Sequence, residues 1–342
     1  MKFVRGALGL VLGLALPLAV AGAATIHVPG DYLTIQEAVD AAAYGDEILV
    51  APGSTYASPT REAGAGDTTL CSVILKSGIK LRGSGAGQTF IHGDSVGRVL
   101  HLYQCEDVEI SDLTVTEGFA EYFGSGIFCR QSSPYIHDVE VEGNWDGGIS
   151  MIEGSHPVIE NCVMDNNEAK AGGGLAVEAT CHPYLYDCRI TNNRAPFAGG
   201  AIVRSDATLY NCTISGNRTS GSVNVLGGGI LVVDIAEPVI IGCEISNNEC
   251  FGNGGGIAFI GEGCGGLLLG CTVTGNVSTG LEGHGGGISV TSGANPEIRK
   301  CVVADNYTTG QWSDCGGMYV EYAGVNASDC TFYGNWTEGD GA

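Results

Sequence analysis

The sequence predicts an all-β protein, a parallel β-helix with three short strands in each coil and a short N-terminal capping helix. Two short phrases recur in the same order from about residue 108 to the end of the 342-residue chain. They return at a period of 22 to 31 residues over eight copies. Such a period is typical of a solenoid, in which each repeat packs only against its neighbours. No copy contains a stretch with helical periodicity that is long enough for a helical repeat.

One phrase is built on an apolar column, most of whose members are cysteines: Leu113, Val139, Cys162, Cys188, Cys212, Cys243, Cys271, Cys301 and Cys330. Apolar residues also stand three positions before this column and two positions after it. A single strand cannot turn all three positions inward, because its side chains alternate between two faces. The phrase therefore predicts two short strands joined by a bend.

The position just before the column indicates where that bend lies. It holds Asp, Asn or Gly in every copy except the one with Lys300. These residue types tolerate a left-handed backbone, so we expect a tight turn there.

The other phrase supplies the third strand. Each copy opens with glycine followed by an apolar residue, as at Gly174–Leu175 and Gly256–Ile257. Between the two phrases stands an asparagine, five residues after the column: Asn144, Asn167, Asn193, Asn217, Asn248, Asn276, Asn306 and Asn335. Stacked asparagines can bond to one another and to turn backbone, so we interpret this column as structural.

The segment 24–60 is interpreted as an N-terminal cap. It begins with a strand at Thr25–Val28 and continues with a helix that Thr34 caps and in which Glu37 completes a capping box. A strand at Glu47–Val50 follows. Residues 54–70 are expected to form an irregular loop, before short strands near 73–75, 79–81, 89–91 and 99–102.

Residues 1–23 have the pattern of a secretory signal peptide. Lys2 and Arg5 precede an apolar run over 7–20, and Ala21-Gly-Ala23 offers a small-residue cleavage site. The run is short for a membrane span, and no later run approaches that length. We therefore expect a single β-helix domain over 24–342 that is secreted or held at the cell surface. Because Gly339-Asp-Gly-Ala342 repeats the opening of the glycine phrase, we also expect the C-terminal end to be truncated.

Two stretches carry a family resemblance. The opening Thr34-Ile-Gln-Glu-Ala-Val39 with Gly45-Asp-Glu-Ile-Leu-Val50 resembles the start of right-handed β-helix proteins of the pectin-lyase-like superfamily. Gly199-Gly-Ala-Ile202 and Phe332-Tyr-Gly-Asn335 resemble the repeats of polymorphic outer-membrane proteins. The resemblance implies a right-handed coil. It implies no single activity, because this superfamily includes lyases, hydrolases, epimerases and adhesins.

The chain is strongly acidic. It carries 38 acidic and 15 basic residues for a formal charge of −23, which becomes −25 when Lys2 and Arg5 leave with the signal peptide. Such a charge argues against nucleic-acid partners and anionic membranes. It also disfavours polyanionic substrates such as pectate or alginate.

Fourteen cysteines in an exported chain raise the question of disulfides. The column cysteines stack in register and are expected to be buried free thiols, and Cys129 is expected to face inward. Cysteines in turns are the better disulfide candidates: Cys181, Cys250, Cys264 and Cys315. A linear stack of thiols does not offer the tetrahedral geometry of a metal site.

No catalytic set of the resembled superfamily is complete. Gly283-His284-Gly285, with Arg299-Lys300 downstream, resembles the histidine motif of polygalacturonase-type hydrolases, but the Asp-Asp pair those enzymes need is absent. The same glycines also belong to the repeated glycine turn. No cofactor is expected, and no motif supports the calcium site that lyases of this superfamily use.

One connection varies in length, and this variation is the best pointer to function. The step from the asparagine to the glycine phrase takes five residues between Asn144 and Ile149 but thirteen between Asn217 and Ile230. Insertions in a solenoid gather on one edge, which is often the binding edge. Besides Lys170, this edge carries the candidate ligand-binding residues Trp145, Asp146, Arg194, Phe197, Arg218, Phe251, His284, Trp312 and Asp314.

Aromatic rings along such an edge could stack on sugars, whereas the simpler interpretation is that they cover the glycine-rich turns. We therefore expect an exported binding module whose partner is a polysaccharide or a cell-surface component, rather than an enzyme. The alternative is a carbohydrate-active enzyme, either a polysaccharide lyase or a glycoside hydrolase. A cluster of carboxylates on the variable edge would favour that alternative.

Overall fold

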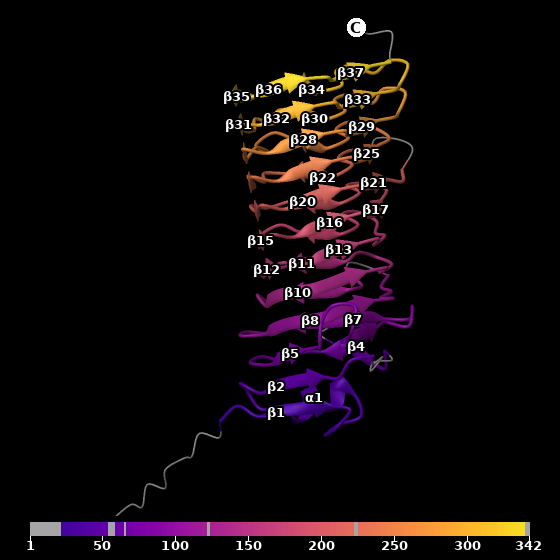
Figure 1. The fold of residues 1–342 in the computed structure, drawn as a ribbon, viewed down its shortest axis with the longest axis vertical. Helices are drawn as coiled ribbons and strands as arrows, with labels where there is room; N and C mark the ends of the chain where they lie inside the picture. Colours follow the sequence, from indigo (N-terminus) through magenta and orange to yellow (C-terminus); the bar gives the residue numbers. More distant parts are fainter. Residues whose placement is uncertain (1–21, 54–58, 65, 122–123, 222–224, 339–342) are drawn as a thin grey trace, which may run out of the picture.

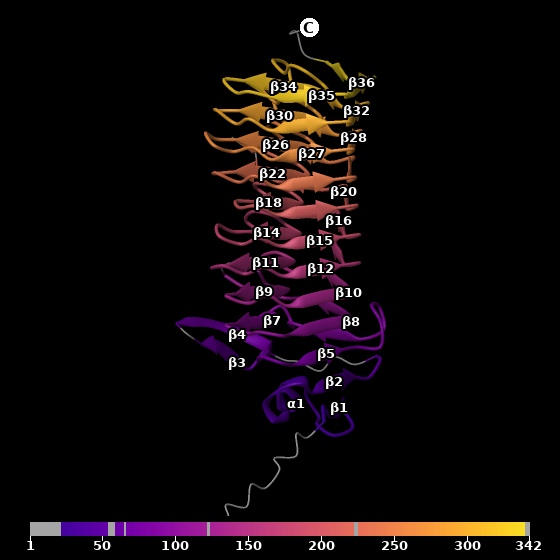
Figure 2. The same ribbon diagram turned by 90° about the vertical axis from the view of Figure 1, so that its left-hand side faces the viewer.

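The computed structural model describes residues 22–53, 59–64, 66–121, 124–221 and 225–338. Within this part of the chain, coils of short parallel strands stack along one long axis (Figures 1 and 2). The expected signal peptide, apart from Gly22 and Ala23, and the final Gly339–Ala342 lie outside the described residues. The all-β parallel β-helix expected from the repeats is confirmed.

The described strands form three sheets. Sheet A has 20 strands, which lie on both sides of the bend: β1 (Thr25–Val28), β2 (Glu47–Val50), β5 (Lys80–Arg82), β6 (Phe90–His92), β8 (Glu109–Thr116), β10 (Tyr135–Glu142), β12 (Val158–Glu160), β13 (Val163–Asp165), β15 (Tyr184–Tyr186), β16 (Arg189–Thr191), β19 (Thr208–Tyr210), β20 (Thr213–Ser215), β23 (Val239–Ile241), β24 (Glu244–Ser246), β27 (Leu267–Leu269), β28 (Thr272–Thr274), β31 (Glu297–Arg299), β32 (Val302–Ala304), β35 (Asn326–Ser328) and β36 (Thr331–Tyr333).

Sheet B holds the strands of the glycine phrase and has 11 members: β3 (Arg61–Gly64), β4 (Asp67–Ile74), β7 (Arg98–Tyr103), β9 (Ile127–Arg130), β11 (Ile149–Ile152), β14 (Leu175–Val177), β18 (Ala201–Val203), β22 (Ile230–Val233), β26 (Ile257–Ile260), β30 (Ile288–Thr291) and β34 (Met318–Glu321). Sheet C has 6 members: β17 (Arg194–Ala195), β21 (Arg218–Thr219), β25 (Glu249–Cys250), β29 (Val277–Ser278), β33 (Tyr307–Thr308) and β37 (Trp336–Thr337).

The bend within sheet A lies where the sequence predicted it. Asp112, Asp187 and Asn211 have φ angles of 57°, 52° and 54°, in the left-handed region. Lys300, the one residue that broke the pattern, also adopts this conformation with φ of 53°. The surrounding coils therefore impose the bend even where the side chain does not favour it.

Sheet C was not expected as a strand layer. Its members follow directly after the column asparagines and run for only two residues, as in Arg194–Ala195. Two residues are too few to show the alternation by which a strand is recognised in sequence. The sheet runs up one edge of the solenoid (Figure 1).

The prediction of an irregular loop over 54–70 is wrong for its described part. Strands β3 and β4 form a hairpin, and Arg61 pairs with Cys71 in the antiparallel sense. The Arg61 guanidinium also binds both carboxylate oxygens of Asp40 at 2.9 and 2.8 Å. The short-chain residues Ser, Thr, Ala and Gly of this segment hide the hairpin because they give no apolar alternation.

Helix α1 (Ile35–Ala41) lies at the first coil, as expected. Thr34 accepts a hydrogen bond from the Glu37 backbone N–H at 3.2 Å, and the Glu37 carboxylate accepts one from the Thr34 N–H at 3.1 Å. Ile35, Ala38 and Val39 are buried against the first strands. In the described part of the chain, no helix is long and apolar enough to cross a membrane.

All fourteen cysteines are free thiols. The expectation that Cys181, Cys250, Cys264 and Cys315 are disulfide candidates is therefore wrong. The first three are fully buried, so they pack inside the coils rather than meeting across exposed turns. Burial raises the pKa of Cys264 to about 11 and that of Cys250 to about 12, which keeps both thiols protonated and unreactive.

The column asparagines form a continuous ladder of buried amides. Asn217 Oδ1 accepts hydrogen bonds from the backbone N–H and the Nδ2 of Asn193, both at 3.0 Å. Its own Nδ2 donates to Asn248 Oδ1 at 2.9 Å and to the Ile190 carbonyl at 2.8 Å. The amide is thus fully paired, and each coil supplies hydrogen bonds to its neighbours.

Glycine is required where the backbone passes this ladder. A Cβ atom on Gly229 would lie 2.6 Å from the Gly256 carbonyl oxygen and 2.9 Å from Asn248 Nδ2. No side chain fits at that distance, which explains why the glycine phrase recurs beside the asparagine column.

A buried arginine fastens the hairpin to the following coils. Arg98 is 1% exposed; its Nη1 lies 2.9 Å from Asp67 Oδ2, and its Nε donates to the Gly124 carbonyl at 2.8 Å. The guanidinium lies 4.0 Å from the ring centre of Phe128. His101 Nδ1 lies 3.2 Å from Arg98 Nη1, so it must accept and the imidazole must be neutral. Burial and the charge of Arg98 lower the pKa of His101 to about 4.

We predict that Asn217→Ala lowers the free energy of unfolding by about 3 kcal/mol, because each buried donor left without an acceptor costs about 1–3 kcal/mol. Two donors of Asn193 lose their acceptor in this variant. The shift is measured as the midpoint of urea-induced unfolding. Asn335→Ala, in the half-exposed last rung, is the control and is expected to cost less because water can replace the bonds. Equal losses in both variants would contradict the ladder as a buried network.

We also predict that stability falls as the pH is lowered from 6.5 toward 4. His101 binds its proton near pH 6.5 in the unfolded chain but only near 4 in the fold, so acid favours unfolding in this window. The pKa difference corresponds to about 3 kcal/mol. In His101→Phe, which keeps a ring against Phe128, the melting temperature is expected to fall less steeply with acid. Parallel pH profiles for His101→Phe and for the exposed-site control His182→Gln would refute the assignment.

Candidate ligand-binding edge

One column of exposed residues runs along the edge formed by sheet C. The residue after each asparagine pairs with its counterpart in the next coil, from Trp145 through Glu168 to Arg194, and Phe119, which follows Gly118, pairs with Trp145 in the same column. Sheet C continues the column through Arg218, Glu249, Val277, Tyr307 and Trp336. The corners that vary in length begin here, so the edge carries the residues that the sequence singled out.

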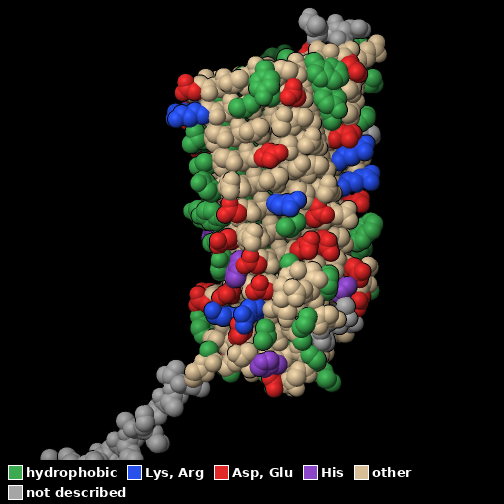
Figure 3. All heavy atoms as spheres, in the orientation of Figure 1, with side chains coloured by type: hydrophobic (Ala, Val, Ile, Leu, Met, Phe, Trp, Pro, Cys, Tyr) green, Lys and Arg blue, Asp and Glu red, His purple; other side chains and the backbone are tan. Residues whose placement is uncertain are grey.

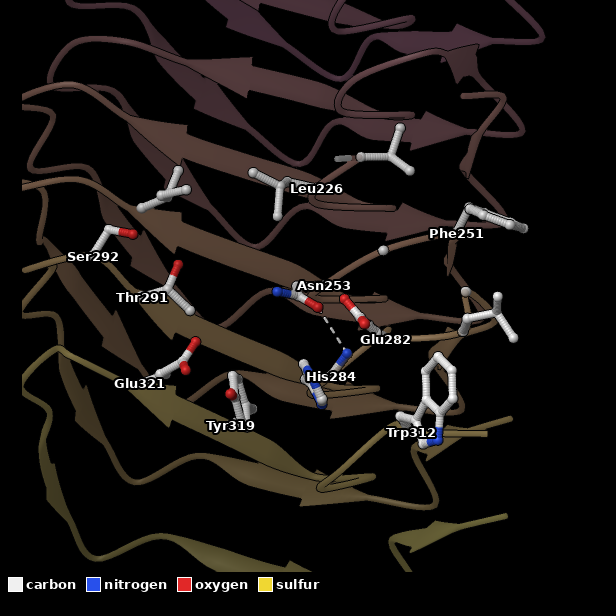
Figure 4. A pocket seen from close by; sticks show the side chains of 15 residues that line it. Leu226, Phe251, Asn253, Glu282, His284, Thr291, Ser292, Trp312, Tyr319 and Glu321 are labelled. Atoms are coloured by element: carbon white, nitrogen blue, oxygen red, sulfur yellow. Dashed lines mark hydrogen bonds between the residues drawn. The ribbon is translucent and has the colours of Figure 1, made fainter. Parts of the chain in front are cut away.

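A groove of about 780 Å³ opens beside the upper part of this edge (Figure 4). Its floor is the outer face of sheet B, with Ile260, Thr291, Tyr319 and Glu321, and Ser292, which follows β30. Its wall is made of successive corners, which contribute the side chains of Leu226, Phe251, Asn253, Leu281, Glu282, His284 and Trp312. The groove lies where the corners are longest, with thirteen residues from Asn217 to Ile230 and twelve from Asn276 to Ile288.

The groove begins where a cluster of apolar side chains on the outer face of sheet B ends. In earlier coils the space between corners and sheet B holds a small cluster of Ala176, Ala198, Ile202, Leu231 and Ala258. The outward column of sheet B then changes character, since Ala258 pairs with Ser289 and Ser289 with Tyr319. The neighbouring column changes in the same way, from Ile260 to Thr291 and Glu321. Polar side chains thus replace the filling and leave the floor open.

His284 is held firmly at the centre of the groove. Its backbone N–H donates to Asn253 Oδ1 at 2.8 Å, and its Nδ1 accepts from the Asp314 backbone N–H at 2.9 Å. The imidazole stacks on Tyr319 with centroids 4.4 Å apart. Because Nδ1 accepts, the proton of the neutral ring sits on Nε2, which leaves a hydrogen-bond donor for a ligand.

The charges that line the groove are negative. Glu282 and Glu321 are its charged side chains, and no lysine or arginine is among the described residues that line it. Burial and the negative charge of Glu321 raise the pKa of Tyr319 to about 12, so its hydroxyl stays protonated. Acidic side chains also predominate over basic ones on the face seen in Figure 3. An anionic polymer would be repelled here.

The predicted edge residues fall into three groups. Phe251, His284 and Trp312 line the groove, and Asp314 orients His284 from behind. Trp145 and Asp146 line a second, smaller pocket with Lys170. Arg194, Phe197 and Arg218 lie between the two and line neither, and Arg218 pairs with Glu249 at 3.2 Å.

The sequence reasoning missed the floor of the groove. Thr291, Tyr319 and Glu321 belong to strands of the glycine phrase, which was considered only for its inward residues. The outward-facing positions of those strands could have indicated the floor of the groove, because their residues change from alanine and leucine to serine and tyrosine. Glu282 was also missed, although it lies two residues before His284 in one of the longest corners.

No group of three or more His, Cys, Asp or Glu side chains in the described part of the chain is placed to hold a metal ion.

The family model described as a right-handed β-helix region matches residues 76–234, 125–286 and 222–341. The chain is similar to the solved structure of the pectate lyase Pel9A with a TM-score of 0.55 and 15% identity, over 91% of this chain and 79% of the lyase. No curated protein matches the sequence.

Two further solved structures are similar. A rhamnogalacturonan lyase has a TM-score of 0.52 and 12% identity, over 90% of this chain and 87% of its own. The ORF18 protein of Geobacillus virus E2 has a TM-score of 0.50 and 12% identity, over 93% of this chain and 62% of its own. At these identities the likeness shows the fold alone.

Proposed function

Because the chain belongs to the right-handed β-helix family, whose model matches residues up to 341, we propose that it is an exported module whose edge groove binds a neutral polysaccharide. The observation that carries the proposal is the groove itself. Exposed aromatic side chains stand two coils apart on its wall, Phe251 at 40% and Trp312 at 57% exposure, above a polar floor. Flat apolar faces beside hydrogen-bonding groups suit the ring and the hydroxyls of a sugar.

The direction of the groove favours a polymer. Its wall comes from corners of four successive coils, represented by Leu226, Phe251, Leu281 and Trp312. Successive coils lie about 4.8 Å apart, which is the spacing of neighbouring strands. A chain of sugars lying along the axis would therefore meet one corner after another. The absence of lysine and arginine from the described lining supports a neutral polymer over an anionic one.

The alternative is catalysis on the same polymer. One observation favours it, because Glu282, Glu321 and His284 line one groove and carboxylates are the usual acid and base of glycoside hydrolysis. The binding assay below therefore includes a search for new reducing ends and for unsaturated products. Cleavage of any polysaccharide by the unaltered protein, and its loss in Glu282→Gln, would replace the binding proposal with the enzymatic one.

We predict that the mature protein binds at least one of a panel of neutral glucans, mannans and xylans in affinity electrophoresis, and that Trp312→Ala weakens this binding at least about tenfold. Truncating a central aromatic of a binding surface commonly costs more than about 1.4 kcal/mol, which is tenfold in affinity. Tyr210→Ala, which removes an aromatic of 49% exposure from sheet A, is the matched control. Binding of pectate or alginate in preference to the neutral polymers, or equal affinity in both variants, would refute the proposal.

Export is the second part of the proposal, and it rests on the signal pattern of residues 1–23. We predict that expression of the full chain in a secreting host releases a protein that begins with Ala24, and N-terminal sequencing of the released protein measures this. Replacing Lys2 and Arg5 by Glu should retain the protein inside the cell, because the positive end of the signal is lost. Full-length protein found only in the cytoplasm would contradict export.

A further inference from the structure

A second pocket lies lower on the same edge, and it contains an anomaly that the groove does not explain. The pocket encloses about 310 Å³, and Phe119, Trp145, Asp146 and Lys170 are among its lining residues. Phe119 and Trp145 are neighbours on adjacent coils, with 47% and 56% of their surfaces exposed. Two aromatic side chains are thus held side by side at the surface.

Asp146 is the anomaly. Its φ angle is 127°, a backbone conformation that side chains other than glycine rarely adopt. Its Oδ2 is the one buried side-chain oxygen or nitrogen in the described part of the chain that has no hydrogen-bond partner. This backbone conformation is held in place because the N–H groups of Asp146 and Gly147 both donate to the Glu168 carbonyl, at 2.7 and 2.9 Å. Burial raises the pKa of the Asp146 carboxyl group, while the charge and the backbone N–H of Lys170 act on it in the opposite direction.

Both features destabilise the fold. Glycine would adopt this backbone without strain, as its neighbour Gly147 does with a φ of 102°. An unpaired buried carboxylate oxygen also costs free energy. Asp146 lines a surface pocket, and a strained residue there with an unpaired acceptor atom is the arrangement expected when a ligand supplies the missing donor.

We propose that this pocket is a separate sugar-binding subsite, in which a sugar ring packs on Trp145 and one of its hydroxyl groups donates to Asp146 Oδ2. The ligand class rests on the proposed function, whereas the site itself rests on Asp146 and the two aromatic rings. A hydroxyl donor fits better than a cation, since the Lys170 ammonium already lies in the pocket and donates to the Glu121 carbonyl. Lys170 reaches that carbonyl from two coils away, so its side chain crosses the pocket, and under this proposal the side chain must move when the sugar enters.

The subsite is distinct from the groove. Four steps of the edge column separate Trp145 from Glu249, the position beside Phe251, through Glu168, Arg194 and Arg218. At about 4.8 Å per step this is roughly 19 Å along the axis. A long polysaccharide could contact both places, whereas a single sugar ring can occupy only one.

The test uses methyl glycosides of glucose, mannose, xylose and galactose, with binding followed by ligand-observed NMR on the mature protein carrying Trp312→Ala. At least one glycoside is expected to bind, and Trp145→Ala and Asp146→Gly are each expected to weaken it at least about tenfold. Trp336→Ala, which removes an exposed tryptophan at the far end of the same column, is the control and should leave binding unchanged.

Asp146→Gly gives a second readout that a structural role would not produce. Because it removes both the strain and the unpaired oxygen, this variant is expected to melt at a higher temperature while it binds less. A lower melting temperature would show that Asp146 serves the fold and would overturn the inference.

Glycoside binding that is unchanged in Trp145→Ala and Asp146→Gly would also overturn the inference. If the unaltered protein retains polysaccharide binding that depends on Trp312, the proposed function survives this failure. If the unaltered protein binds no sugar of any kind, both proposals are wrong.

Discussion

Each coil of this solenoid depends on its neighbours for the hydrogen bonds of one buried amide. Asn217 gives hydrogen bonds to the coil of Asn248 and to the carbonyl of Ile190, and it accepts two from the coil of Asn193. The amide can satisfy these partners only when the segment from the bend to the asparagine has the same length in every coil. This requirement fixes the register of sheet A, and glycines such as Gly229 follow from it because the backbone must pass close to the amides.

The same requirement decides where the chain can vary. Additional residues within the bend segment would leave a buried amide unpaired, whereas residues added after the asparagine extend into solvent. Corner length therefore varies most on one edge, and the groove beside Phe251, His284 and Trp312 includes the longest corners. The floor below them opens because Ser289 and Tyr319 stand where Ala258 and Leu231 keep earlier coils filled. Two local changes thus produce the groove while the coil itself stays constant.

The sequence was most informative where a structural feature can be formed by only a few residue types. The bend, the asparagine column and helix α1 could be predicted because left-handed backbone, buried amides and the capping box each demand particular side chains. Sheet C and the β3–β4 hairpin could not, since two-residue strands and short polar side chains leave no periodic signal. The turn cysteines misled in a different way, because Cys181, Cys250 and Cys264 look exposed in sequence but are covered once the corners close.

Candidate site residues were predicted only in part, for a related reason. Phe251, His284 and Trp312 lie in variable corners and were found by their position there. Thr291, Tyr319 and Glu321 face outward from strands whose inward residues dominate the pattern, so the burial signal concealed them. Trp145 and Asp146 were predicted as edge residues, but the strain at Asp146 depends on its φ angle, which cannot be predicted from the residue type.

The parallel, in-register stacking of sheet C has a consequence for recognition over distance. Every residue of the edge column, from Phe119 to Trp336, stands a whole number of coil heights from every other, at about 4.8 Å per coil. The edge therefore presents equivalent positions at a constant spacing of one coil. A polymer whose own repeat length equals a whole number of coil spacings places each unit at an equivalent position, whereas a polymer with a different repeat loses this match after a few units. Selectivity on such a surface can therefore reside in the length of the ligand's repeat as much as in the chemistry of any one sugar.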